Sequence, residues 1–88
     1  MLRKMRRHDA TLKRELDINW LTEQDPKVIE AADNATNPTQ CKRIAFQSGL
    51  SARNVRNALR LATFKRDCPQ EYDRLMREYI AIRGGAAL

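Results

Sequence analysis

The chain has 88 residues, the length of one small domain, which leaves no room for a second hydrophobic core. Its 17 basic and 11 acidic side chains give a net charge of +6, and 42% of its residues are hydrophobic, as in ordinary folded domains. No apolar run approaches the roughly 18 residues of a membrane span, and residues 1–8 are basic without the apolar segment of a secretory signal behind them. We therefore expect a cytoplasmic protein that has no membrane partner.

The content of cysteine and histidine argues against metal and enzyme chemistry. Cys41 and Cys68 are far apart in the sequence, and together with the single histidine, His8, they cannot supply four zinc ligands from one chain. We expect both cysteines to be free thiols. The sequence also lacks a glycine-rich phosphate loop and a supported nucleophile–histidine pair. These observations predict a protein that is not an enzyme and has no metal or cofactor.

Charge is distributed in blocks along the chain. Residues 1–14 hold six basic side chains against one acidic one, whereas residues 15–34 hold six acidic side chains against one basic one. Residues 35–66 hold seven basic side chains and no acidic one. A segment of this kind binds a polyanion with the least repulsion. The acidic 15–34 segment would face away from such a ligand, or offer a surface to a protein partner.

The first predicted element is a helix over about residues 10–21. Asp9 is its candidate N-cap, because a side-chain oxygen at that position accepts a hydrogen bond from the first helical turn. Leu12, Leu16 and Trp20 follow at helical spacing and predict one apolar face. We expect Trp20 to lie in the core.

Two further start signals precede the middle helices. Asp25 followed by proline is typical of an N-cap with proline in the first helical position, and it predicts a helix over 26–33. Asn37, also followed by proline, predicts a helix over 38–48, and Gln40 is placed to reach back to the backbone N–H of the cap.

The remaining two helices are predicted over 52–65 and 69–83. Ser51 is the candidate N-cap of the first, and Asp67 or Cys68 opens the second. The paired glycines that begin at Gly84 are expected to end it. Because the alternation typical of strands is absent, we expect an all-α fold, a small bundle of about five helices.

The two helices around Gly49 carry small and apolar residues at mechanically constrained positions. Gly49 adopts the left-handed backbone conformation of a turn at low cost. Ala45 is small where the second helix crosses the first, and Leu50 fills the gap between them. Val55 and Ala58 face the first helix from the second.

This spacing resembles the helix-turn-helix of prokaryotic DNA-binding proteins over residues 41–60, and it implies such a motif at about 38–62. The departure from the pattern is Ser48, where an apolar residue is common. Residues 54–61 are also similar to the motif of plasmid and chromosome partition proteins. The resemblance implies a non-enzymatic protein that binds double-stranded DNA.

The second helix of this pair has an apolar face and an acid-free polar face on opposite sides, at about 100° per residue. The predicted apolar face consists of Val55, Ala58, Leu59 and Ala62. Arginine suits the guanine edge in the major groove and asparagine the adenine edge. The predicted base contacts are Arg53, Arg56, Asn57 and Arg60. The predicted contacts with the DNA backbone are Thr39, Gln40, Lys42, Arg43, Ser51 and Asn54.

The last predicted helix has an apolar stripe wider than one packing contact needs. We expect part of it to pack on the helix-turn-helix and part to pair with a second copy of the chain. A homodimer would place two recognition helices about 34 Å apart on a pseudo-palindromic site. The alternative is a stripe that belongs entirely to the core. The predicted packing and dimerisation face is Tyr72, Leu75, Met76, Tyr79 and Ile80.

The sequence thus predicts a flexible basic arm over 1–8, which either enters a minor groove or only aids solubility, and a single helical domain over 9–88. The expected function is sequence-specific DNA binding, as a transcriptional regulator or a recombination-accessory factor of a prokaryotic or mobile genetic element. The alternative is a protein-binding adaptor or anti-activator that keeps the same fold. RNA binding is disfavoured, since neither an RNP-like aromatic set nor a GXXG loop is present.

Overall fold

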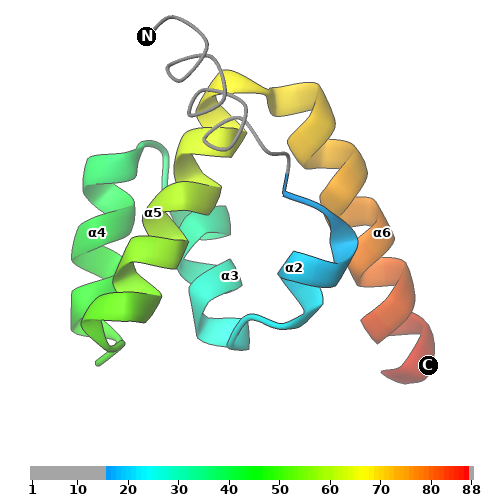
Figure 1. Cartoon of the computed structure of the whole chain (residues 1–88), viewed down its shortest axis with the longest axis horizontal. Coiled ribbons are helices and arrows are strands. Elements are labelled where there is room, and N and C mark those ends of the chain that lie inside the picture. The colour runs from blue at the N-terminus through cyan, green and yellow to red at the C-terminus, as the bar shows by residue number, and fades with distance from the viewer. Residues whose placement is uncertain (1–15, 88) are drawn as a thin grey trace, which may run out of the picture.

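The computed structural model describes residues 16–87, and over these residues the protein is a small all-α bundle (Figure 1). The expected fold class is confirmed, since the described part of the chain consists of five helices and no strand. The arm expected over 1–8 and the Asp9 cap lie outside the described residues. The helices are α2 (Ile18–Thr22), α3 (Pro26–Asn34), α4 (Pro38–Gln47), α5 (Ala52–Asp67) and α6 (Pro69–Ala87).

The first described helix begins later than predicted. Asp17 has extended backbone, and its side chain accepts a hydrogen bond of 2.8 Å from the backbone N–H of Trp20. Asp17 is therefore the N-cap of α2, and the prediction of one helix over 10–21 is wrong at Leu16 and Asp17. The physical reason is that a short acidic side chain competes for the N–H groups of the following turn and so starts a helix rather than continuing one.

The next three start signals are confirmed. Asp25 accepts from the N–H of Lys27 at 2.9 Å, and Asn37 accepts from the N–H of Gln40 at 2.8 Å. Ser51 accepts from the N–H of Asn54 at 3.2 Å. Each cap satisfies a donor that the helix itself leaves without a partner.

The reach of Gln40 differs from the prediction. Its side-chain oxygen accepts from both the backbone N–H of Thr36 at 2.6 Å and the Thr36 hydroxyl at 3.0 Å, rather than from the N–H of Asn37. The turn before α4 is therefore clamped one residue earlier than in an ordinary capping box.

Gly49 makes the turn between α4 and α5. It has a φ of +78°, the left-handed conformation that favours glycine, and the N–H of Leu50 donates to the carbonyl of Ala45 at 3.2 Å. Ser48 is exposed, and its hydroxyl donates to the carbonyl of Ile44 at 2.9 Å. A polar residue fits this position because it faces solvent and has a backbone partner.

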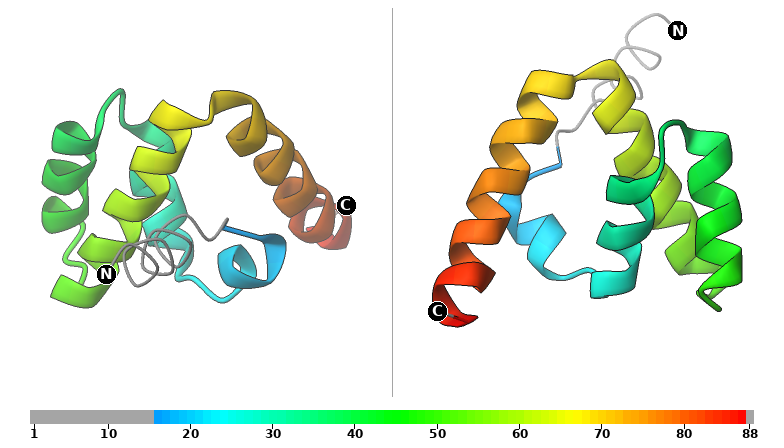
Figure 2. Two further views of the ribbon diagram at one scale, coloured as in Figure 1. Left: turned by 45° about the horizontal axis from the view of Figure 1, so that its top comes forward. Right: turned by 180° about the vertical axis from the view of Figure 1, so that it is seen from behind.

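The helices pack around one core. α3, α4 and α5 contact one another, while α6 contacts α5 and α2. In Figures 1 and 2, α4 and α6 lie at opposite ends of the molecule with α3 and α5 between them. The largest fully buried side chains of the described residues are Leu21, Val28, Cys41 and Leu61.

The last helix is longer than predicted. It runs on to Ala87 through Gly84 and Gly85, which keep helical backbone. Glycine inside a helix costs only about 1 kcal/mol relative to alanine, and this cost by itself does not end a helix. Within residues 16–87 no helix is both long enough and apolar enough to cross a membrane.

Candidate nucleic-acid interface

Three arginines of α5 lie along one exposed side of the helix. Its buried side chains are Val55, Ala58, Leu61 and Ala62. At about 100° per residue, Arg53, Arg56 and Arg60 all lie within about 40° of the direction opposite the midpoint of that buried face. All three are exposed. The structure therefore brings the predicted arginines together as one stripe along the outside of α5, which we call the arginine stripe.

The two asparagines lie at the edge of this face. Leu61, which is not part of the predicted apolar face, is completely buried, so the buried side of α5 extends further toward Asn54 and Asn57 than predicted. As a result Asn54 and Asn57 are half-buried, beside the arginine stripe rather than within it. Leu59, predicted to face inward, is also only half-buried.

α4 adds a second exposed surface. Thr39, Lys42 and Arg43 are exposed and share the side of α4 that faces away from buried Cys41 and Ala45. Gln40 and Ser51, by contrast, are engaged in the turn and cap described above. Of the six predicted backbone contacts, these two are held by the protein itself.

Phe46 is a feature that the sequence reasoning did not single out. It lies on the outer side of α4 with Lys42 and Arg43, and 57% of its surface is exposed. Its spacing of three and four residues from these cations could have signalled a shared face. An exposed aromatic beside two cations is a surface suited to a ligand or partner.

Arg60 is held by a residue from a different helix. Its guanidinium carbon lies 5.5 Å from the centroid of the Trp20 ring on α2. This separation is within the reach of a cation–π interaction, about 6 Å. Trp20 packs against the core and is half-buried, so that the core position expected for it is only partly correct.

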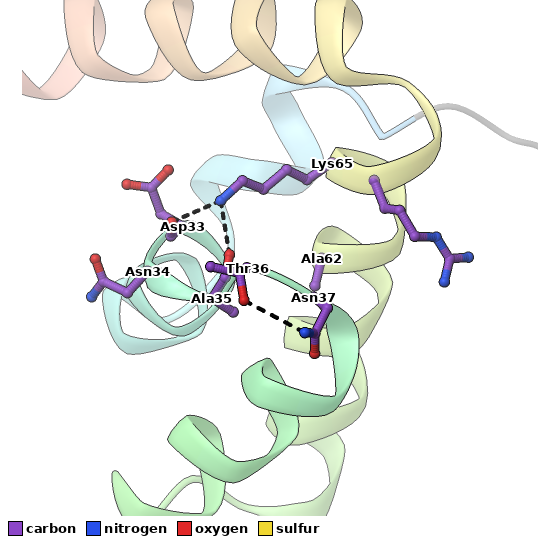
Figure 3. A pocket seen from close by; sticks show the side chains of 8 residues that line it. Asp33, Asn34, Ala35, Thr36, Asn37, Ala62 and Lys65 are labelled. Atoms are coloured by element: carbon purple, nitrogen blue, oxygen red, sulfur yellow. Dashed lines mark hydrogen bonds between the residues drawn. The ribbon is translucent and has the colours of Figure 1, made fainter.

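The side chain of Lys65, near the end of α5, is hydrogen-bonded within the protein. Its ammonium donates to the backbone carbonyls of Asp33 at 2.8 Å and Ala35 at 3.1 Å (Figure 3), and to that of Ala32 at 3.4 Å. These carbonyls lie at the end of α3, where the helix has no further N–H to offer them. The same ammonium lies 5.5 Å from the ring of Tyr72.

Tyr72 completes the link from α5 to α3 and α6. Its hydroxyl donates to a carboxylate oxygen of Asp33 at 2.8 Å. Burial, together with this hydrogen bond to an anion, raises the pKa of Tyr72 far above its ordinary value. The phenol is therefore neutral and holds α6 against the end of α3.

Arg66 is also paired within the chain. Its guanidinium lies 2.9 Å from the carboxylate of Asp67, in an exposed ion pair. Seven basic residues lie between residues 35 and 66. Five of them remain on exposed surfaces, and none of these five forms an ion pair with a carboxylate of residues 16–83. They are Lys42, Arg43, Arg53, Arg56 and Arg60.

α6 places the middle of its apolar stripe in the core. Tyr72, Leu75 and Tyr79 are each less than 10% exposed, and Met76 is half-buried. Ile80 and Ile82 are 59% and 52% exposed. Two residues apart on a helix, they point about 160° away from each other, so they form the two edges of the stripe rather than one patch.

A pocket of about 440 Å³ opens where the α3–α4 turn meets the end of α5. Its lining includes Asp33, Thr36, Asn37 and Lys65, and Figure 3 shows the lysine directed at the backbone of the turn. Asn37 donates to the Thr36 hydroxyl, Lys65 donates to backbone carbonyls, and the Asp33 carboxylate accepts from the hydroxyl of Tyr72. Elsewhere in the described part of the chain, buried Cys41 donates to the carbonyl of Ala58 at 3.4 Å, and burial raises the pKa of its thiol.

Comparison of the chain with protein-family models, with curated proteins and with solved structures found no match.

Proposed function

We propose that this protein binds double-stranded DNA in a sequence-specific manner, with α4, the Gly49 turn and α5 acting as a helix-turn-helix. The observation that carries the proposal is the arginine stripe of Arg53, Arg56 and Arg60. An α-helix matches the major groove in width. The three exposed arginines on one face of α5 match it in charge, because no acidic residue precedes Asp67 on that helix.

The exposed side of α4 supplies contacts of a different kind. Lys42 and Arg43 are cations without a local carboxylate partner in the described residues, and they are suited to phosphates, which carry no sequence information. Thr39 lies in the first turn of α4, where backbone N–H groups also favour an anion. In this proposal α5 reads bases and α4 sets the position of the protein on the duplex.

The biological use that we propose is transcriptional regulation, or an accessory role in recombination, in a prokaryotic cytoplasm or for a mobile genetic element. A homodimer through the exposed edge of α6 at Ile80 is part of this proposal, because a palindromic site requires two recognition helices.

Selection from a random duplex library at two salt concentrations tests the proposal. The expected result is an enriched motif whose binding weakens steeply as salt rises, since each neutralised phosphate releases counterions. A palindromic motif would support the dimer. Replacing Lys42 by alanine is expected to weaken binding to all sequences alike. It is also expected to reduce the slope of the logarithm of the binding constant against the logarithm of the salt concentration by about one.

A protein-binding adaptor is the second candidate, and the exposed Phe46 beside Lys42 and Arg43 favours it. In that case the library would return no enriched motif, and only weak, salt-sensitive binding would remain. The partner would be an acidic protein, because Lys42 and Arg43 flank Phe46, and Phe46→Ala would then abolish its binding while leaving the residual DNA binding unchanged.

A further inference from the structure

The contact between Trp20 and Arg60 joins α2 to the arginine stripe. α2 is a single turn of helix, but the backbone of Trp20 is held within it. The backbone N–H of Trp20 donates to the side chain of the Asp17 cap, and its backbone carbonyl accepts from the side chain of Gln24 at 3.0 Å. The adjacent Leu21 is completely buried. The indole ring itself packs against the core, whereas the arginine above it is an exposed side chain.

We propose that Trp20 is a positioning residue of the nucleic-acid interface, which orders Arg60 for contact with a base or phosphate. This inference rests on the proposed function. A free arginine side chain loses rotamer entropy when it is immobilised by a ligand. The ring immobilises the side chain in advance, so that less entropy is lost when DNA binds.

The contact with Trp20 leaves the arginine able to bind. A guanidinium over an aromatic ring can present its flat face to the ring, whereas hydrogen bonds to a guanine edge or a phosphate use the N–H groups at its rim. Arg60 can therefore keep its ring contact and still donate. In residues 16–83 neither Arg53 nor Arg56 has an aromatic ring at this distance. The three arginines of the stripe thus differ in how far they are ordered before binding.

The test is a double-mutant cycle, measured as specific binding to the motif enriched by the wild-type chain. Trp20→Leu is expected to weaken specific binding by about three- to tenfold. Trp20→Tyr, which keeps an aromatic face, is expected to restore most of the loss. In a chain that already carries Arg60→Ala, Trp20→Leu is expected to have no further effect on binding. An equal loss with and without Arg60 would overturn the proposal, because Trp20 would then act only through the fold.

A second measurement does not depend on the folding of a tryptophan variant. The chain has one tryptophan, so tryptophan fluorescence reports on the surroundings of Trp20, which include the Arg60 side chain. Arg60→Ala is expected to shift the emission of Trp20 and to increase its quenching by acrylamide in the absence of DNA, whereas Arg74→Ala on α6 is not. Unchanged fluorescence in the Arg60 variant would overturn the contact itself.

The two hypotheses fail in different ways. A wild-type chain that enriches no motif would remove the proposed function, and with it the role assigned to Trp20, even if the fluorescence shift is observed. If the wild-type chain enriches a motif, but Trp20→Leu weakens binding equally with and without Arg60, only the role of Trp20 would be removed.

Discussion

The two ends of α5 both carry basic side chains, but these side chains have different partners. Arg53 and Arg56, in the first half, are exposed and have no carboxylate partner in the described residues. Lys65 and Arg66, in the last turn, are bonded to α3 carbonyls and to Asp67. Both groups count equally in the net charge. The comparison teaches that charge density along a helix does not measure the charge available to a ligand, because contacts within the folded chain, from another helix for Lys65 and from the end of α5 itself for Arg66, decide it.

The largest expected effect is on stability, at the second of these ends. Lys65→Met is expected to lower the free energy of unfolding by about 3 kcal/mol, because it leaves three carbonyls at the end of α3 without their charged donor. Urea denaturation measures this loss. Sequence preference for DNA is expected to stay as in the wild type. An altered enriched motif with unchanged stability would place Lys65 in the ligand-binding face and contradict the difference between the two ends of α5.

The next largest effect is on binding, at the first end. Arg56→Ala is expected to cost about 2 kcal/mol of specific DNA binding and to relax preference at one base pair, with stability unchanged within about 0.5 kcal/mol. Titration of the selected duplex and of a scrambled one measures both quantities. Arg74→Ala removes the same charge from exposed α6 and is the matched control. Equal losses in the two variants would mean that only net charge matters.

A smaller effect is expected from the phenol that holds the same junction. Tyr72→Phe removes the hydrogen bond to Asp33 and is expected to cost about 1 kcal/mol of stability near pH 7. Arg53→Ala serves as a control that does not touch this junction. A loss of DNA affinity in Tyr72→Phe without a loss of stability would contradict the structural role.

The same tyrosine predicts a loss of stability at alkaline pH. The pKa of Tyr72 is raised in the folded chain, so its contribution is fully present below the pKa of about 10 that tyrosine has when unfolded, and is lost as pH rises above it. The raised pKa of buried Cys41 acts in the same direction from about pH 8.5. Thermal unfolding between pH 7 and 11 is expected to show a falling midpoint, with a shallower fall in Tyr72→Phe.

The smallest effect is expected at Arg66. Its ion pair with Asp67 is exposed and screened by solvent, so Arg66→Ala is expected to leave both stability and specific binding close to those of the wild type. Thermal unfolding and duplex titration at low and high salt measure the two effects. A large loss of binding would show that Arg66 leaves Asp67 for DNA and belongs with the arginine stripe.

Much of the fold could be predicted because helix starts are local. The caps at Asp25, Asn37 and Ser51 each act on an N–H two or three residues away, so a short stretch of sequence contains both partners. Gly49 could be placed for the same reason. The candidate interface was predicted in part: the three arginines of α5 share a face by helical periodicity alone, whereas the half-burial of Asn57 follows from the packing of Leu61.

The dimer, the DNA ligand and the N-terminal arm remain predictions, and of these the sequence supplies the charge and the motif on which they depend. The sequence by itself determined the order of the helices from α3 to α6 and the acid-free character of residues 35–66, because composition and capping are read over a few neighbouring residues. Only the tertiary structure decided which of those cations remain exposed. Lys65 finds its carbonyls and Arg60 finds Trp20 about 30 or more positions away, and contacts over such separations form only when the helices pack.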